Sequence, residues 1–292
     1  LSATVGDEIN MMTTTNAQLV RRTFITGFAA TCMLLPQLSS AQAAYPQKPV
    51  KVVVAFTAGG TTDILARIVA QQLTEKLKQP FVIDNKGGGG GVPAMQEVAR
   101  STADGHTLIL GHVGSMAVNP LIFPNSGYDV NKDFTPITLL AKVPSLFVIH
   151  PDVPAKNFTE FVAYVKRNPG KLNYGSYSGV TQLMHTRIKQ GAKADLNFIN
   201  YKGEAPTISD ILGGHVQMTF ATPTTTLQHI KEGKLRAMAM LLPTRYSQLP
   251  NVPTAQEAGL PPLPAATWAA LFGPAKLPNE IAQRMNKELN AA

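Results

Sequence analysis

The sequence predicts an α/β fold in which helices cover largely parallel β-sheets, and two observations support this prediction. Short β-branched or aromatic runs alternate with amphipathic helical patterns along most of the chain, which is typical of such sheets. The order of strand, small or polar turn, and helix also recurs at Phe56–Thr62, Gly111–Ser115 and Gly175–Thr181, and more weakly at Ala221–Thr226. Because the carboxyl ends of parallel strands lie at one edge of a sheet, these turns are expected to line a polar cleft with few charges.

The clearest of these units is the stretch Val50–Leu77. Val50–Phe56 has the composition of a buried strand, and Ala58-Gly59-Gly60 is a turn that only small residues can make. Apolar residues then recur at helical spacing, with Thr61 or Thr62 as the expected N-cap. The free N–H groups at such a helix start favour an anion, although many α/β proteins use the same unit for packing alone.

The remaining elements follow from the same patterns. Further strands are predicted at Phe81–Asp84, Thr107–Gly111, Phe134–Leu140, Ser145–Ile149, Leu172–Gly175, Leu196–Ile199, Val216–Phe220, Leu235–Leu242 and Thr267–Phe272. Further helices are predicted at Pro93–Ala99, Phe158–Lys166, Val180–Gln190, Ala205–Leu212, Leu227–Glu232 and from Pro278 onward.

Residues 1–43 are predicted to be a signal peptide, with a possible upstream extension before the first methionine. Arg21-Arg22 precede the mostly apolar segment Phe24–Leu35, and Ala41-Gln42-Ala43 is a small-x-small cleavage motif. The apolar segment is too short and too interrupted to anchor in a membrane, and a buried N-terminal helix is the alternative. We therefore expect export to the periplasm, by the Sec or the twin-arginine route.

Composition limits the possible functions of the mature chain, which would begin near Ala44. The sequence has a net charge of +8, but its basic residues are scattered and do not alternate with aromatic ones, so no nucleic-acid surface is expected. A diffuse positive field favours the approach of small anions, unless the charge simply reflects surface composition. The only cysteine, Cys32, lies in the predicted leader, so the mature chain would have neither a disulfide nor a thiol nucleophile.

No catalytic or metal-binding pattern accompanies the predicted cleft. The segment Gly175–Gly179 is similar to a nucleophile elbow but has Tyr177 where that motif needs serine. The run Gly87–Gly91 lacks the lysine of a phosphate-binding loop, and the histidines form no zinc motif. Trp268 is expected in the core. We therefore predict no enzyme activity, no cofactor and no bound metal.

Many short segments, in this order and spacing, match one family. They are Tyr45–Pro49, Phe56–Asp63, Ala103–Leu108, Tyr128-Asp129, Lys132–Ile137, His150-Pro151, Leu172–Ser176, Tyr201–Gly203, Asp210–Gly214, His229–Ala237 and Asn251–Thr254. Through them the chain, from Tyr45 to its end, resembles the substrate-binding proteins of tripartite tricarboxylate transporters, the Bug or TctC-like family.

The resemblance implies a two-lobe periplasmic-binding fold, type II-like, with two crossover strands. Lobe 1 would comprise residues 44–143 and 235–292, and lobe 2 residues 144–234, with crossings near Lys142–Ser145 and Gly233–Arg236. The chain stops a helix or two short of what the family leads us to expect, so the C-terminal part of lobe 1 is expected to be truncated.

The resemblance also implies a function. The lobes would close on a small organic carboxylate, held largely by backbone N–H groups, hydroxyls and waters. The receptor would pass its ligand to membrane permease subunits, or alternatively signal to a membrane sensor kinase. A third interpretation of the sequence is an exported hydrolase. A monomer is expected.

Carried onto this chain, the family's ligand-binding residues form two groups. Lobe 1 would supply Phe56, Thr57, Ala58, Gly59, Gly60, Thr61, Thr62, Gly111, His112, Gly114 and Ser115. Lobe 2 would supply Ser176, Tyr177, Ser178, Gly179, Tyr201, Ala221, Thr222 and Pro223. The family commonly has an Asp or Asn after the strand that ends at Phe220, and this chain has Ala221-Thr222-Pro223 there instead. With the added Tyr177, this change predicts an aromatic or longer aliphatic carboxylate, less polar than aspartate or citrate.

Overall fold

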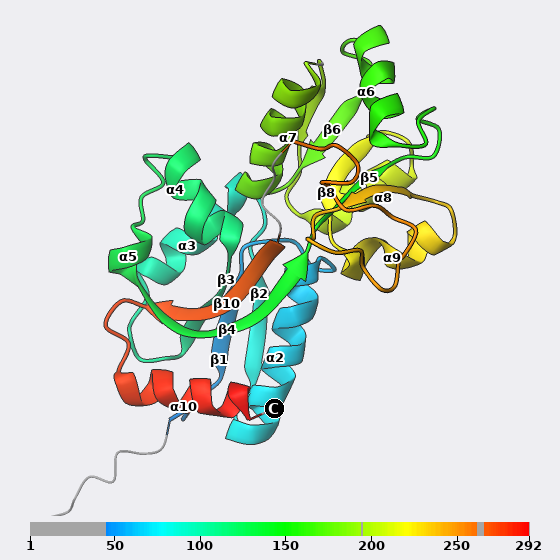
Figure 1. Ribbon diagram of the computed structural model, residues 1–292. Coiled ribbons are helices and arrows are strands. Elements are labelled where there is room, and N and C mark those ends of the chain that lie inside the picture. The colour runs from blue at the N-terminus through cyan, green and yellow to red at the C-terminus, as the bar shows by residue number, and fades with distance from the viewer. Residues whose placement is uncertain (1–44, 194, 262–265, 292) are drawn as a thin grey trace, which may run out of the picture. The chain divides into compact units, whose positions relative to one another are not determined.

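The computed structural model of the protein describes residues 45–193, 195–261 and 266–291. These residues form two five-stranded sheets, each with its own helices, which we call lobe 1 and lobe 2 (Figure 1). The predicted signal peptide lies outside the described residues. Within the described ranges, no helix combines the length and apolar character needed to cross a membrane.

Lobe 1 is built on a sheet with the strand order β2-β1-β3-β10-β4. Its strands are β1 (Val50–Val54), β2 (Phe81–Asn85), β3 (Thr107–His112), β4 (Phe134–Pro144) and β10 (Ala266–Pro274). β1 pairs in parallel with β2 and β3, whereas β10 runs antiparallel to both β3 and β4. All four valines of β1 are fully buried, as expected of a strand with helices on both faces.

Lobe 2 repeats this arrangement with the strand order β7-β6-β8-β5-β9. Its strands are β5 (Leu146–Ile149), β6 (Asn173–Ser176), β7 (Asn197–Asn200), β8 (Met218–Ala221) and β9 (Arg236–Met240). β6 is parallel to β7 and β8, and β5 is antiparallel to β8 and β9. In each sheet the reversed strand, β10 or β5, is the one that follows a crossing from the other lobe. The predicted two-lobe α/β fold with mostly parallel sheets is confirmed.

Helices cover both sheets. In lobe 1 they are α2 (Thr61–Leu77), α3 (Val92–Ala99), α4 (Asn119–Ile122), α5 (Val130–Asp133) and α10 (Asn279–Asn290), with short turns η2 (Gly89–Gly91) and η3 (Gly114–Val118). In lobe 2 they are α6 (Phe158–Arg167), α7 (Gly179–Ala192), α8 (Glu204–Leu212) and α9 (Pro223–Lys231). α2 packs along β1 and β2 and contacts α10 (Figure 1). It does so through one apolar stripe that includes Ala66, Val69, Leu73 and Leu77.

The core of lobe 2 is centred on aromatic residues. Phe147 of β5 is fully buried and stacks on Phe220 of β8, with ring centroids 4.9 Å apart. Phe161 of α6 meets the ring of Phe147 edge-on at 5.3 Å. These three rings join the crossover strand, a parallel strand and a covering helix, so they fix the end of β5 that leads to the other lobe.

The two crossings between the lobes differ in how well the sequence located them. β4 continues to Pro144 and β5 begins at Leu146, so the first crossing is at Ser145, within the predicted range. The prediction that lobe 1 resumes at residue 235 is wrong, because β9 pairs with β5 in lobe 2. Its Met238 and Met240 are buried in lobe 2 cores, and the chain returns to lobe 1 only between β9 and β10.

Candidate functional site

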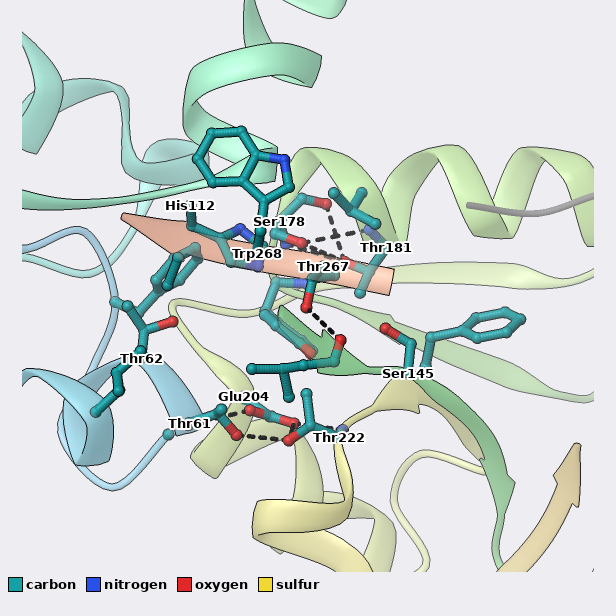
Figure 2. A pocket seen from close by; sticks show the side chains of 18 of the residues that line it. Thr61, Thr62, His112, Ser145, Ser178, Thr181, Glu204, Thr222, Thr267 and Trp268 are labelled. Carbon is teal, nitrogen blue, oxygen red and sulfur yellow. Dashed lines mark hydrogen bonds between the residues drawn. The ribbon is translucent and has the colours of Figure 1, made fainter. Parts of the chain in front are cut away.

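A pocket lies between the lobes, at the carboxyl ends of the parallel strands (Figure 2). It is lined by Phe56, Gly60, Thr61, Thr62, Leu65, His112, Val143, Ser145, Tyr177, Ser178, Val180, Thr181, Met184, Glu204, Phe220, Thr222, Thr267, Trp268 and Ala269. Its volume is about 30 Å³, which is room for about two water molecules. Both lobes, the first crossing and the start of β10 therefore contribute to one small cavity.

The structure brings together part of the predicted set of binding residues. Those that line the pocket are Phe56, Gly60, Thr61, Thr62, His112, Tyr177, Ser178 and Thr222. Those that are not among its lining residues are Thr57, Ala58, Gly59, Gly111, Gly114, Ser115, Ser176, Gly179, Tyr201, Ala221 and Pro223. The binding role of each remains a prediction.

Two residues of the second group, Thr57 and Gly59, lie at the contact between the lobes, and Tyr201 bonds within lobe 2. The Tyr201 hydroxyl donates to Asp210 at 2.6 Å within lobe 2. A Cβ atom added at Gly203 of lobe 2 would lie 3.0 Å from the backbone nitrogen of Thr57, so these segments are in close contact. Gly59 has a left-handed φ of 83°, and its own added Cβ would lie 3.5 Å from Cβ of Ala205.

Sequence reasoning missed two important lining residues, Glu204 and Trp268. Trp268, expected in the core, lies on β10 just after the second crossing. Its place in the sequence could have indicated this role, because a segment that crosses between two lobes must pass beneath the cleft between them. Glu204 is the first residue of α8 and follows the turn at Tyr201 that the resemblance had marked.

A buried carboxylate holds the turn between β1 and α2 in place. Asp63 accepts hydrogen bonds from the Gly59 backbone at 2.9 Å, from Arg67 Nε at 3.0 Å and from Asn85 Nδ2 at 3.0 Å. Burial alone would raise the pKa of Asp63, but these hydrogen bonds outweigh it and hold the pKa below its usual value. The expectation that Thr61 or Thr62 caps α2 is wrong: Gly60 occupies the cap position and Asp63 organises the turn.

The corresponding turn of lobe 2 is held by Thr181. Its Oγ1 accepts from the backbone N–H groups of Tyr177 at 3.0 Å and Ser178 at 2.9 Å. The Ser178 hydroxyl in turn accepts from the Thr181 backbone at 3.3 Å, which completes a capping box at the start of α7. The turn is therefore rigid, and the first N–H groups of α7, which have no acceptor within the helix, begin at Gly179 beside the pocket.

Glu204 is a buried carboxylate that reaches from lobe 2 to lobe 1. Its side chain is only 5% exposed. Oε1 accepts from the Thr222 backbone at 2.8 Å, from the Thr222 hydroxyl at 3.0 Å and from the Thr225 hydroxyl at 2.9 Å. Oε2 accepts from the backbone of Thr61, the first residue of α2, at 3.2 Å. The helix start that was expected to hold a ligand's carboxylate is thus occupied in part by the protein's own.

His112 lies at the end of β3 as a neutral donor. Burial lowers the pKa of His112 to about 4. The backbone N–H of Gly114 donates to Nδ1 at 3.0 Å, so the proton of the neutral ring is assigned to Nε2. The ring packs edge-on against Phe56 at 5.5 Å, and Phe56 packs against Tyr177 at 6.4 Å. An aromatic wall therefore runs from lobe 1 to lobe 2.

Several donors of the pocket lining make no hydrogen bond within the described part of the chain. They are the hydroxyls of Thr62, Ser145 and Tyr177, Nε2 of His112 and the indole N–H of Trp268. Burial, together with the charge of Glu204, raises the pKa of Tyr177 well above its usual value, so its hydroxyl remains a donor. Among the described residues, no group of three or more His, Cys, Asp or Glu is placed to hold a metal ion.

The lowered pKa of His112 predicts a specific loss of stability in acid. The folded pKa is about 4 and the unfolded one about 6.5, so the unfolded state binds more protons between these values and stability falls as pH falls. This single group should remove about 1–2 kcal/mol of the free energy of unfolding between pH 7 and pH 5. Urea denaturation of the wild type and of His112→Asn checks this. The variant should lose less stability over that range, and equal losses would contradict the assignment.

Comparison with known proteins agrees with this architecture. Residues 65–292 match the model of the family described as tripartite tricarboxylate transporter family receptor, TctC.

Three solved structures are similar to the chain. The periplasmic binding protein BugD is 34% identical, with a TM-score of 0.81 over 85% of this chain and 83% of BugD. MatC (Rpa3494) of Rhodopseudomonas palustris, solved with bound malate, is 33% identical, with a TM-score of 0.81 over 85% of each chain. Rpa4515 of R. palustris, solved with adipate, is 34% identical, with a TM-score of 0.80 over 85% of this chain and 84% of that one. The chain is therefore a Bug or TctC-like solute-binding receptor and belongs to the tripartite tricarboxylate transporter receptor family.

Proposed function

We propose that this receptor is exported, captures a small organic carboxylate by closing its two lobes, and delivers it to the permease of a tripartite tricarboxylate-type transporter. The observation that carries the proposal is the group of neutral hydrogen-bond donors in the pocket that have no partner within the described part of the chain.

A carboxylate suits these donors. It accepts hydrogen bonds at about four positions, and bonds to an ionised acceptor are stronger than those between neutral groups. No lysine or arginine is among the described residues that line the pocket. The ligand's charge would therefore be stabilised by donor groups and by the N-terminal end of α7, whose dipole favours an anion.

The ligands of two similar structures support the ligand class. MatC carries malate and Rpa4515 carries adipate, and both are small organic acids. Their similarity to this chain extends over most of its length, so a carboxylate is the first class of ligand to test.

Closure of the lobes follows from the size of the pocket and from the contacts around it. The cavity of about 30 Å³ is too small for an acid of several carbons, so the lobes must separate to admit one. Contacts between the lobes then reform around the ligand, for example between the hydroxyls of Thr61 and Thr222, which lie 2.5 Å apart. A ligand that contacts both lobes stabilises the closed arrangement through its greater affinity for that arrangement.

Gly203→Ala is expected to weaken ligand binding by roughly tenfold or more. The added Cβ would collide with the Thr57 side chain of the other lobe and hold the lobes apart. Gly213→Ala, at the other end of α8, is the matched control, because the nearest neighbours of its added Cβ belong to lobe 2. Calorimetric titration of both variants checks the prediction, and equal affinities would show that this contact is not part of closure.

The function itself is tested by a thermal-shift screen against monocarboxylates and dicarboxylates of four to eight carbons, together with aromatic acids. A ligand that binds only the native state stabilises it by about 2.7 kcal/mol when present at about a hundred times its dissociation constant. We expect at least one acid to raise the unfolding midpoint while its neutral amide does not. A screen in which no acid raises the midpoint would contradict the proposal.

Export and the membrane partner belong to the same proposal. The signal-peptide pattern before Ala44 and the periplasmic relative BugD support export, and the family description supports a transporter. Protein recovered from the periplasmic fraction should begin near Ala44. Uptake of the bound acid should depend on the permease genes; a receptor that activates a sensor kinase without supporting uptake would favour the sensory role instead.

A further inference from the structure

We propose that Glu204 makes this receptor selective for ligands with a single carboxylate, whose far end is apolar or carries a hydrogen-bond donor. The inference rests on the proposed function and specifies its class of ligand. It follows from where the one acidic side chain of the described pocket lining lies and from what already surrounds it.

Glu204 is the only acidic side chain among the described residues that line the pocket, and none of them is a lysine or arginine. It is 5% exposed and makes no ion pair within the described part of the chain. Its hydrogen bonds come from hydroxyls and backbone N–H groups of Thr61, Thr222 and Thr225, so its negative charge is held in place but not neutralised. A buried charge of this kind acts strongly on a second charge nearby, because little water screens it.

The pocket has two chemically different ends. Glu204, Thr61 and Thr222 lie together at one end, and His112, Ser178 and Trp268 lie at the other (Figure 2). The donor groups of Thr61 and Thr222 are already hydrogen-bonded to Glu204 or to each other, whereas Nε2 of His112 and the indole N–H of Trp268 are unbonded within the described chain. The ligand's carboxylate is therefore expected at the end with the unbonded donors.

Six other residues of the lining have apolar side chains. They are Phe56, Leu65, Val143, Val180, Met184 and Phe220. These side chains, and the neutral hydroxyls of Thr62, Ser145 and Tyr177, offer no cation to a charged group, so a ligand that spans the pocket should be uncharged along its middle.

The end near Glu204 determines what the far end of the ligand can be. A second carboxylate there would face Glu204 with no cation to separate the two charges. Oε1 accepts three hydrogen bonds but Oε2 only one, so Oε2 can accept another from a hydroxyl or ammonium group. This pocket should therefore discriminate against dicarboxylates such as adipate and malate, the ligands of Rpa4515 and MatC.

The test compares acids of equal length by calorimetric titration: butyrate with succinate, hexanoate with adipate, and octanoate with suberate. The wild type should bind the better monocarboxylates at least roughly tenfold more tightly than the matching dicarboxylates. 6-Hydroxyhexanoate should bind at least as well as hexanoate. In Glu204→Gln, which removes the charge and keeps the size, the affinity for the dicarboxylate should rise roughly tenfold relative to the affinity for the matching monocarboxylate.

Glu75→Gln is the matched control, because Glu75 is exposed on α2, outside the pocket lining, and its loss changes the net charge equally. It should leave the ratio of the two affinities unchanged. If Glu204→Gln does not fold, the ratio of monocarboxylate to dicarboxylate affinity in the wild type still tests the inference. Dicarboxylates that bind the wild type as tightly as monocarboxylates would overturn this inference but leave the proposed function standing. Failure of every acid to bind would overturn the proposed function instead.

Discussion

Replacement of Thr61 with aspartate is expected to weaken carboxylate binding by roughly a hundredfold. The Thr61 hydroxyl lies 2.5 Å from that of Thr222, and its backbone N–H donates to Glu204 at 3.2 Å. The new carboxylate would thus lie next to an existing one, at the point where the lobes meet. Two like charges about 5 Å apart repel each other by about 3 kcal/mol at an effective dielectric constant of ~20, which is equivalent to roughly a hundredfold in affinity.

Controls separate this repulsion from other effects of the substitution. Thr61→Val removes the hydroxyl contact without adding charge, and its loss of affinity should remain below roughly tenfold. In the double variant Thr61→Asp, Glu204→Gln, part of the lost affinity should return, because the substitutions are coupled through the same contact. Calorimetric titration with the tightest acid of the screen provides the measurement. If Thr61→Asp retains wild-type affinity, the turn between β1 and α2 does not belong to the site.

Phe147→Ala is expected to destabilise the protein by about 3–5 kcal/mol. Phe147 is fully buried on the crossover strand β5, and its ring stacks on Phe220 at 4.9 Å and meets Phe161 at 5.3 Å. Truncation removes these contacts and leaves a cavity that rigid neighbours cannot fill. The loss is a large fraction of the roughly 5–15 kcal/mol that stabilises a typical native domain.

Urea denaturation followed by circular dichroism measures this effect. Phe198→Ala is the matched control, since that ring lies in the same lobe but is 39% exposed, and its loss should be about 1 kcal/mol or less. Phe147→Leu, which refills most of the cavity, should recover most of the stability. A loss for Phe147→Ala no greater than that for Phe198→Ala would contradict the assignment of Phe147 to the core.

Local patterns were sufficient to predict most elements of the fold. The strand at Val50 and the helix that ends at Leu77 were predicted from residue type and helical spacing, and the structure has both. The sheet to which a strand belongs was harder to predict. The pattern at 235–242 indicated a strand but contained nothing about its pairing partner, so β9 was assigned to the wrong lobe.

The candidate site was only partly predictable for a related reason. Residues in the turns after parallel strands, such as His112 and Tyr177, could be found because those turns converge at one edge of a sheet. Glu204 and Trp268 reach the pocket because two lobes approach each other and the chain crosses between them. That information lies in tertiary contacts between residues far apart in the sequence.

The central claim, that a carboxylate binds in the pocket between the lobes, can be tested through the fluorescence of Trp268. It is the only tryptophan of the chain and lines the pocket, so all tryptophan emission comes from the proposed site. Emission should change saturably at the acid concentrations that raise the unfolding midpoint, and the matching amide should have no effect. An acid that stabilises the protein while Trp268 emission stays constant would bind elsewhere, and would contradict the claim.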